Sequence, residues 1–331
     1  MNTIKKKKLG QYFTKKNLWL KPHIINFIKM SGCEIAYDPF AGNGDLLKVS
    51  EEYGIKNIKG LDIDNNLSWD INDSLIHIPH IDNAIIITNP PYLTKYSASR
   101  KHITIDNKYF KNHTDLYQLA IDKMLESQDY IVAIVPETYI NSKYFEKNLS
   151  RVYSVTILTE NPFDDTENPV CIVCFDNVIK NPPEVKVYAD NEFLNDYSYF
   201  KDLKLTPKNK YSIRFNVQKG KIALRAVDLT TNDKKIKFYS KEDLNYDLTK
   251  VGNSSRLITI IDLDCSDIDI KKLVEECNRL LEDYRKKTKD VTLSPFKGNT
   301  KDGKRRRRLD YRTARCIIEN AITNLRSEVY A

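Results

Sequence analysis

The residues Asn89-Pro90-Pro91-Tyr92 combine two fixed hydrogen-bond acceptors with an aromatic ring. They follow residues 84–88, an apolar, β-branched run that is typical of a buried strand. Proline fixes φ and carries no N–H, so this turn is stiff. The side-chain oxygen of Asn89 and the carbonyl of Pro90 can accept both hydrogens of a planar amine, which leaves its nitrogen nucleophilic, and Tyr92 offers a stacking face. The alternative is a proline turn that only ends the strand.

A glycine-rich turn forms a second candidate site, nearer the start of the chain. Residues 34–38 predict a strand and residues 45–53 a helix, and between them lies Pro39-Phe-Ala-Gly-Asn-Gly44. The whole chain holds only ten glycines, so the pair Gly42 and Gly44 indicates a place where backbone approaches a ligand closely. A tight turn without a ligand is the alternative.

Acidic residues come at the ends of the next two expected strands. Residues 57–61 predict a strand, and Asp62 follows it at close to the ~20-residue spacing at which a nucleoside-binding sheet holds a ribose diol. Asp73 falls at the expected end of the third strand, where a carboxylate can accept from an adenine amino group. Asp70 is the competing candidate for that role. Because no Walker lysine follows the glycines, a triphosphate is not expected.

The composition describes a soluble, folded chain of 331 residues, with 41% hydrophobic and 30% charged residues. No apolar run approaches the ~18 residues of a membrane span, and the N-terminus lacks the apolar segment of a signal peptide, so we expect a cytoplasmic protein without a membrane partner. Cys171 and Cys174 lie in an apolar run that predicts a buried strand. Neither the cysteines nor the histidines show metal-ligand spacing, so we expect no metal.

The net charge of +8 is concentrated at the two ends of the chain. Residues 1–16 hold six lysines and no acid, and residues 297–331 hold ten Lys or Arg against four acids. The remainder is therefore net negative. This distribution indicates a polyanionic partner that the termini contact, whereas solvated tails are the alternative.

Strands and helices alternate up to about residue 176, which predicts a doubly wound α/β sheet. The pattern ends at Asn181-Pro-Pro183, so we place one domain at residues 1–183 and a second at 184–331.

Three segments between or after these elements have predicted structures or roles of their own. Residues 93–113 predict a long polar, basic loop that acts as a substrate-contacting flap. Residues 296–304 predict a flexible loop, and residues 305–315 predict the start of the last helix.

In this order, the motifs resemble those of the amino-methyltransferases of DNA, most closely the N6-adenine branch with gamma-class motif order. Asn89-Pro90-Pro91-Tyr92 is similar to the family's catalytic motif, and Phe163 stands where the family has an aromatic residue that stacks on the flipped base. The resemblance covers about residues 9–177. It implies a Rossmann-like, seven-stranded methyltransferase sheet with an antiparallel final strand, followed by a C-terminal DNA-recognition domain. It implies S-adenosylmethionine as cofactor, with these residues binding it: Tyr12, Thr14, Asp38, Phe40, Gly42, Gly44, Asp62 and Asp73.

The activity that the resemblance implies is site-specific transfer of a methyl group to N6 of an adenine that has been rotated out of double-stranded DNA. Tyr92 and Phe163 would stack on the base, while Asn89 and Pro90 hold its amine. The expected setting is a restriction-modification system, with a monomeric, nucleoid-associated enzyme and a cognate endonuclease as a separate chain. Contacts to DNA are expected from Lys95, Arg100, Lys101, Lys304, Arg305, Arg306, Arg307, Arg308 and Arg312.

Other readings of the same residues remain open. The acceptor pair also suits an RNA base or the side-chain amide of a protein glutamine, although the cationic C-terminal region argues against glutamine. A DNA-binding module with a vestigial fold is the non-enzymatic alternative, and the intact glycines, Asp62 and the Asn-Pro-Pro-Tyr turn argue against it.

Overall fold

The computed structural model describes residues 18–329, apart from residues 101, 103–105, 164–166, 182, 232–233, 248–250, 252–256 and 265–266. The chain forms two compact units, Met1–Tyr197 and Ser198–Ala331. The sequence predicted a division after residue 183, but the first unit continues to Tyr197 because two further strands extend its sheet.

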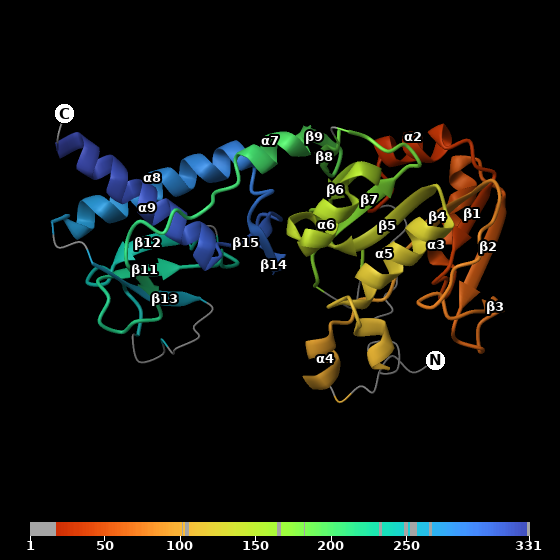
Figure 1. The fold of residues 1–331 in the computed structure, drawn as a ribbon, viewed down its shortest axis with the longest axis horizontal. Helices are drawn as coiled ribbons and strands as arrows, with labels where there is room; N and C mark the ends of the chain where they lie inside the picture. The colour runs from red at the N-terminus through yellow and green to blue at the C-terminus, as the bar shows by residue number, and fades with distance from the viewer. Residues whose placement is uncertain are drawn as a thin grey trace. The chain divides into compact units, whose positions relative to one another are not determined.

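The first unit is built on a nine-stranded mixed sheet (Figure 1). In sheet order its strands are β3 (Asp70–Ile71), β2 (Asn57–Asp62), β1 (Ile35–Asp38), β4 (Ala84–Thr88), β5 (Tyr130–Pro136), β7 (Val170–Phe175), β6 (Val152–Ile157), β8 (Lys186–Ala189) and β9 (Glu192–Asp196). The five strands from β3 to β5 are parallel, and β7 is antiparallel to both neighbours. The sheet thus has nine strands instead of the expected seven, because β8 pairs with the open edge of β6 and β9 pairs with β8.

The central strands are apolar throughout because helices cover the sheet. Every residue of β4 and of β7 is buried, which explains their continuous rather than alternating apolar sequences. The helices of this unit include α2 (Pro22–Met30), α3 (Asp45–Ser50), α5 (Leu116–Ser127) and α6 (Lys143–Asn148). Figure 1 shows α5 lying across the sheet. Cys171 and Cys174 are free and buried in β7, as their apolar context predicted.

The predicted flap is not an uninterrupted loop. It contains the helix α4 (Lys95–Arg100) and the 3-10 helix η2 (Asn107–Phe110). The amide of Leu93 donates to the Asp115 carboxylate at 2.9 Å, which closes the base of the excursion. Leu93 also packs with Phe110 in a small separate core. The polar sequence did not indicate this ordered structure, because a few apolar side chains are enough to stabilise a segment whose base is held by a hydrogen bond.

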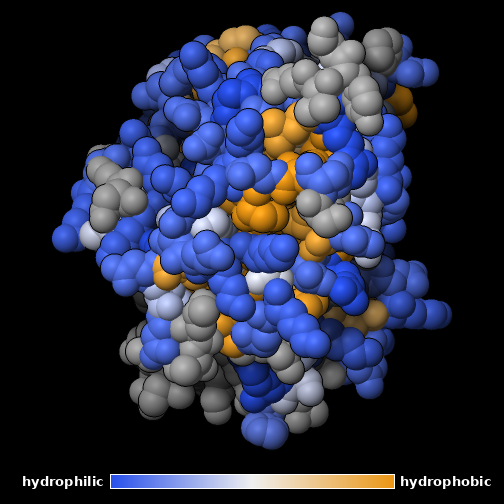
Figure 2. Space-filling view, turned by 90° about the vertical axis from the view of Figure 1, so that its left-hand side faces the viewer, coloured by the Kyte–Doolittle hydropathy of each residue, from blue (hydrophilic) through white to orange (hydrophobic). Residues whose placement is uncertain are grey.

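The second unit packs a four-stranded antiparallel sheet against two long helices. Its sheet order is β10 (Ile213–Phe215), β13 (Ile258–Leu263), β11 (Ile222–Arg225) and β12 (Lys237–Ser240), and its long helices are α8 (Ile270–Thr288) and α9 (Tyr311–Val329). Side chains of α8 and α9 share one buried core with one face of the sheet. On the side of the molecule drawn in Figure 2, hydrophobic residues gather in a strip within a mostly hydrophilic surface.

The segment before α9 differs from the sequence prediction. A β-hairpin of β14 (Ser294–Asn299) and β15 (Arg305–Arg308) replaces the predicted flexible loop and helix start. Burial alternates along β15, so adjacent arginines point to opposite sides instead of crowding one helix turn. Within the residues that the structure describes, no helix is long and apolar enough to cross a membrane.

Candidate active site

The two candidate turns meet at one edge of the sheet. β1 and β4 are adjacent and parallel, so the glycine turn after β1 and the proline turn after β4 leave the sheet side by side. The hydroxyl of Thr88, the last residue of β4, donates to Asp38 Oδ1 at 2.5 Å. The same oxygen accepts the amide of Phe40 at 2.9 Å. This buried pair of hydrogen bonds fixes the start of one turn to the start of the other.

Burial raises the pKa of Asp38 to about 7, and the nearby charge of Asp62 adds to the effect, although the hydrogen bonds from Thr88 and Phe40 oppose it. Between about pH 4 and pH 7 the folded chain therefore binds more protons at Asp38 than the unfolded chain does. The free energy of unfolding falls as the pH rises through this window.

We predict that Asp38→Asn makes the free energy of unfolding less dependent on pH between about pH 4 and pH 7. The lost slope should be up to about 1.4 kcal/mol per pH unit, because one titrating proton is removed. Urea denaturation at several pH values measures it. Some slope should remain, since burial also raises the pKa of Asp115 to about 6. Equal slopes in the variant and the wild type would contradict the placement of Asp38.

The glycine turn has the backbone conformation that its sequence suggests. Gly42 and Gly44 have φ of 54° and 75°, in the left-handed region that side chains disfavour. Asp62 is buried, and its Oδ2 accepts the amide of Gly42 at 2.8 Å while its Oδ1 accepts that of Asp64 at 2.9 Å. Each carboxylate oxygen can accept more than one hydrogen bond, so Asp62 can shape the turn and still accept from a ribose hydroxyl.

Trp69 is a residue of this site that the sequence analysis missed. Its indole Nε1 donates to the carbonyl of Gly42 at 2.9 Å. A Cβ placed on Gly44 would lie 2.6 Å from the indole, and one on Gly60 would lie 2.4 Å from it. The ring therefore fits only because glycines stand at both places. The sole sequence signal is that Trp69 is one of two tryptophans in the chain.

The proline turn presents Asn89 half-buried at the end of β4. The hydroxyl of Tyr92 contacts Asn89 Oδ1 and lies 2.7 Å from the carbonyl of Ile134 in β5. The Tyr92 ring is buried and packs edge-on against Tyr117, with ring centroids 6.4 Å apart. The structure thus ties the Asn89 amide to the sheet. Stacking of Tyr92 on a base remains a prediction.

Phe163, the second predicted stacking residue, lies in the segment between β6 and β7. Its side chain is buried, and its amide donates to Asn161 Oδ1 at 3.1 Å. Its contact with a base likewise remains a prediction.

The two acids near β3 have different surroundings. Asp70 is exposed and pairs with Lys59 at 2.5 Å. Asp73 Oδ1 accepts the amide of Leu75 at 3.1 Å, and its Oδ2 accepts the hydroxyl of Tyr109 at 2.5 Å. Tyr109 belongs to η2, so the predicted flap contacts Asp73, the acid predicted to bind the adenine of the cofactor. The sequence did not suggest this contact. Burial, followed by this hydrogen bond, raises the pKa of Tyr109 to about 12.

The predicted DNA-contacting residues of the first unit are partly described. Lys95 and Arg100 are exposed at the two ends of α4, and the Arg100 guanidinium lies 6.0 Å from the ring centroid of Tyr96. Lys101, like the predicted cofactor residues Tyr12 and Thr14, lies outside the described residues.

The arginine run at 305–308, which is predicted to contact DNA, is buried or half-buried along its length. Arg305 and Arg307 are buried, and Arg305 donates to Asn299 Oδ1 at 3.0 Å. Arg306 donates to the carbonyl of Asp228 at 2.8 Å. The side chains of Arg305 and Arg306 therefore make hydrogen bonds within the fold. In contrast, Lys304 is exposed beside the run.

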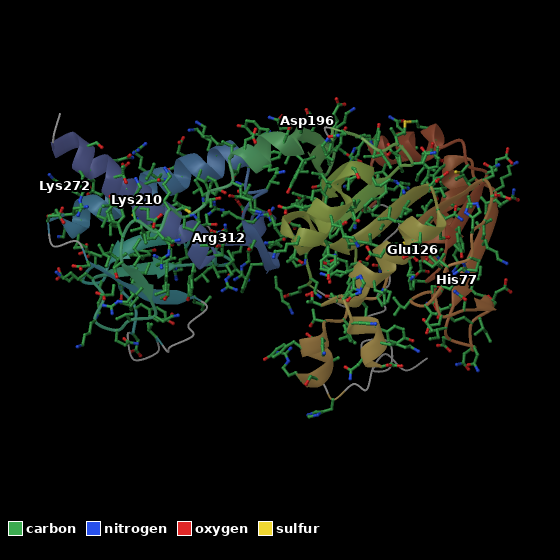
Figure 3. The ribbon with its side chains drawn as sticks, in the orientation of Figure 1. His77, Glu126, Asp196, Lys210, Lys272 and Arg312 are labelled. Atoms are coloured by element: carbon green, nitrogen blue, oxygen red, sulfur yellow. The ribbon has the colours of Figure 1, made fainter. Side chains whose placement is uncertain are left out.

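Arg312, at the start of α9 (Figure 3), is also exposed, as a DNA contact requires.

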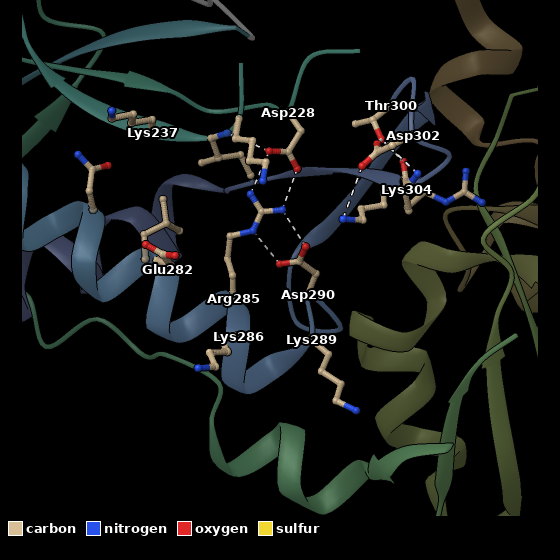
Figure 4. A pocket seen from close by; sticks show the side chains of 15 residues that line it. Asp228, Lys237, Glu282, Arg285, Lys286, Lys289, Asp290, Thr300, Asp302 and Lys304 are labelled. Atoms are coloured by element: carbon tan, nitrogen blue, oxygen red, sulfur yellow. Dashed lines mark hydrogen bonds and ion pairs between the residues drawn. The ribbon is translucent and has the colours of Figure 1, made fainter. Parts of the chain in front are cut away.

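A cavity of about 870 Å³ lies beside β15 (Figure 4). Arg285 spans its wall and makes paired hydrogen bonds to Asp228, both at 2.9 Å, and to Asp290, at 2.9 and 2.7 Å. Asp228 is buried and also accepts the amide of Ile236. These hydrogen bonds occupy the fork of Arg285, so we assign the cluster a structural role.

The strand order with an antiparallel β7, the glycine turn after β1 and the Asn-Pro-Pro-Tyr turn after β4 define the α/β fold of an S-adenosylmethionine-dependent methyltransferase. Residues 3–164 match the family described as Eco57I restriction-modification methylase.

Known relatives cover different shares of the chain. Modification methylase CviBIII of Paramecium bursaria Chlorella virus NC1A is 23% identical over 286 residues, which cover 77% of this chain and 71% of the relative. A Listeria monocytogenes structure described as a class I S-adenosylmethionine-dependent methyltransferase is 16% identical, with a TM-score of 0.38, over 51% of this chain and 64% of that one. A type I restriction-modification methyltransferase subunit from Streptococcus thermophilus is 15% identical, with a TM-score of 0.40, over 54% and 47%. This chain thus spans less than two thirds of either solved chain.

Proposed function

We propose that the protein transfers a methyl group from S-adenosylmethionine to N6 of an adenine in double-stranded DNA. The observation that carries the proposal is the Thr88–Asp38 hydrogen bond, which joins the acceptor turn to the glycine turn. Two reactants bound at these turns would lie next to each other at the ends of β1 and β4.

The residues at the glycine turn suit S-adenosylmethionine. Gly42 and Gly44 keep side chains away from the turn, and the buried Asp62 carboxylate has acceptor capacity for ribose hydroxyls. Asp73 keeps spare acceptor capacity for an adenine amino group even with Tyr109 bound, since a carboxylate offers about four acceptor positions. When bound, S-adenosylmethionine supplies an electrophilic methyl group on a cationic sulfur.

At the proline turn, this chain would prepare the nucleophile. The Asn89 oxygen and the Pro90 carbonyl would accept hydrogen bonds from the two N6 hydrogens. These bonds keep the lone pair on the nitrogen and stabilise the positive charge that develops there during the reaction. Because the Tyr92 hydroxyl and the stiff prolines hold these acceptors in place, little reorganisation is needed during reaction. Rotating an adenine out of the duplex costs a few kcal/mol, and stacking on Tyr92 or Phe163 would return ~1–3 kcal/mol per base.

The test is methylation of plasmid DNA with labelled S-adenosylmethionine, followed by sequencing that maps modified adenines. We expect label at N6 of adenines within one recurring sequence. Label that enters structured RNA or a protein glutamine instead of DNA would contradict the proposal and support the corresponding alternative.

A further inference from the structure

The two faces of the four-stranded sheet in the second unit differ in character. The inner face, which includes Leu224, Phe238 and Ile261, is buried against α8 and α9. Because successive side chains of a strand point to opposite faces, the intervening positions lie on the outer face. In the middle of this face Ala223, Ile258 and Ile260 are buried in a second small core. Around it, and in the same alternation just beyond the strand ends, the described charged residues are Arg214, Lys221, Arg225, Lys237, Lys241, Asp262 and Asp264. Five are cations and two are acids, of which Asp262 pairs with Arg214.

Arg225 and Lys237 form the most unusual part of this face. They are directly opposite each other across β11 and β12, where like charges destabilise a sheet. The Arg225 guanidinium and the Lys237 ammonium each lie 5.7 Å from the centroid of the Tyr239 ring. Among the residues that the structure describes, neither cation has a carboxylate partner. The two cations therefore converge on one ring without internal neutralisation.

Buried donors next to the cluster also have no acceptor. Arg225 Nε is buried and makes no hydrogen bond within the described part of the chain. Two residues further on, Val227 forms an isolated bridge with Arg308, whose Nε is likewise buried and without an acceptor there. Buried donors are normally satisfied, so these two unpaired Nε atoms are unusual.

Charges on the helices that cover the other face are arranged differently. On α8, Arg279 pairs with Glu276 at 2.6 Å and Lys287 pairs with Asp283 at 2.8 Å. Arg326 of α9 pairs with Asp267 at 3.0 Å. Mixed, paired charges of this kind are typical of a solvated surface, whereas Arg225 and Lys237 are two neighbouring cations without a carboxylate partner among the described residues.

We propose that the Arg225–Lys237–Tyr239 cluster, at one end of the outer face of this sheet, binds the phosphodiester backbone of double-stranded DNA. A guanidinium fork and an ammonium suit neighbouring phosphate oxygens, and the Tyr239 ring orients both cations. This inference rests on the proposed function, and it adds the sheet to the predicted DNA contacts of the second unit.

The test compares two double variants that remove equal charge. Arg225→Gln/Lys237→Gln changes the cluster, and Lys271→Gln/Lys272→Gln changes exposed lysines at the start of α8 (Lys272 is labelled in Figure 3). Fluorescence anisotropy measures the affinity for a labelled mixed-sequence duplex over a range of salt concentrations. The cluster variant should lower the slope of log affinity against log salt by roughly 2, since each phosphate contact contributes about 0.9. The α8 variant should keep the wild-type slope.

Two further measurements separate binding from folding. Thermal unfolding should show the cluster variant to be as stable as the wild type or more stable, because a like-charge pair is removed. Arg225→Lys should keep the wild-type slope, because it keeps the charge. A cluster variant that folds and keeps the wild-type slope would overturn the inference alone, whereas a wild-type chain that does not bind the duplex would overturn the proposed function as well.

Discussion

Replacing Asn89 with alanine should slow methyl transfer by about 10²–10³-fold, the cost typical of removing one preorganised polar group from a reacting centre. S-adenosylmethionine affinity should change little, because Asn89 lies on the turn after β4 whereas the predicted cofactor residues that the structure describes lie at or just after the ends of β1, β2 and β3. The two effects would separate because the acceptor acts on the base amine and not on the cofactor. Single-turnover methylation and calorimetric titration of the cofactor measure them independently.

Asn177→Ala is the matched control. Asn177 is exposed and follows β7, which is antiparallel to β5, so it lies at the opposite edge of the sheet from Asn89. This variant should methylate at the wild-type rate. An Asn89→Ala variant that is as active as Asn177→Ala would show that the acceptor role belongs elsewhere.

The residues at the strand ends could be predicted because their signals are local. An apolar run predicts a strand, prolines or glycines end it, and parallel strands place their ends at one edge. Asp38, Asp62 and Asn89 were located in this way, and the structure brings their strands together in the order β2-β1-β4. What the sequence did not contain was the Thr88–Asp38 hydrogen bond, which depends on the register of β1 with β4.

Trp69 and Tyr109 could not be predicted, because each acts through contacts distant in sequence. Trp69 reaches back to Gly42, and Tyr109 reaches back to Asp73. No periodicity or motif encodes such pairs. The same reason explains why the arginine run forms a strand instead of the predicted helix start: only the folded chain shows that Asn299 and Asp228 receive two of these side chains.

The nine-stranded sheet shows a related limit. The break at residues 181–183 is visible in the sequence, but it is a connection within the sheet and not the end of the unit. β8 pairs in parallel with β6, a partner that precedes it by a whole strand, so no local pattern reveals the pairing.

Gly44→Ala should cause the largest loss in the cofactor turn, because two penalties coincide there. The left-handed φ of 75° disfavours a side chain, at about 1–2 kcal/mol. The new Cβ would also lie 2.6 Å from the Trp69 indole, and overpacking of this kind costs about 1–3 kcal/mol. We therefore expect about 2–5 kcal/mol less stability and a cofactor affinity at least about tenfold weaker. Urea denaturation and calorimetric titration with S-adenosylmethionine measure the two losses.

Two other glycines separate the penalties. Gly54 has φ of 89° with open space around its Cβ position. Gly54→Ala should therefore lower stability only by the penalty for a side chain at left-handed φ, and it should leave cofactor affinity unchanged. A Cβ on Gly60 would meet Trp69 at 2.4 Å without a left-handed φ. Gly60→Ala should therefore lower stability only by the overpacking penalty, and it should weaken cofactor affinity because the indole is displaced. If Gly60→Ala leaves stability and cofactor affinity at wild-type values, Trp69 does not hold the turn, and the loss at Gly44 is a backbone effect alone.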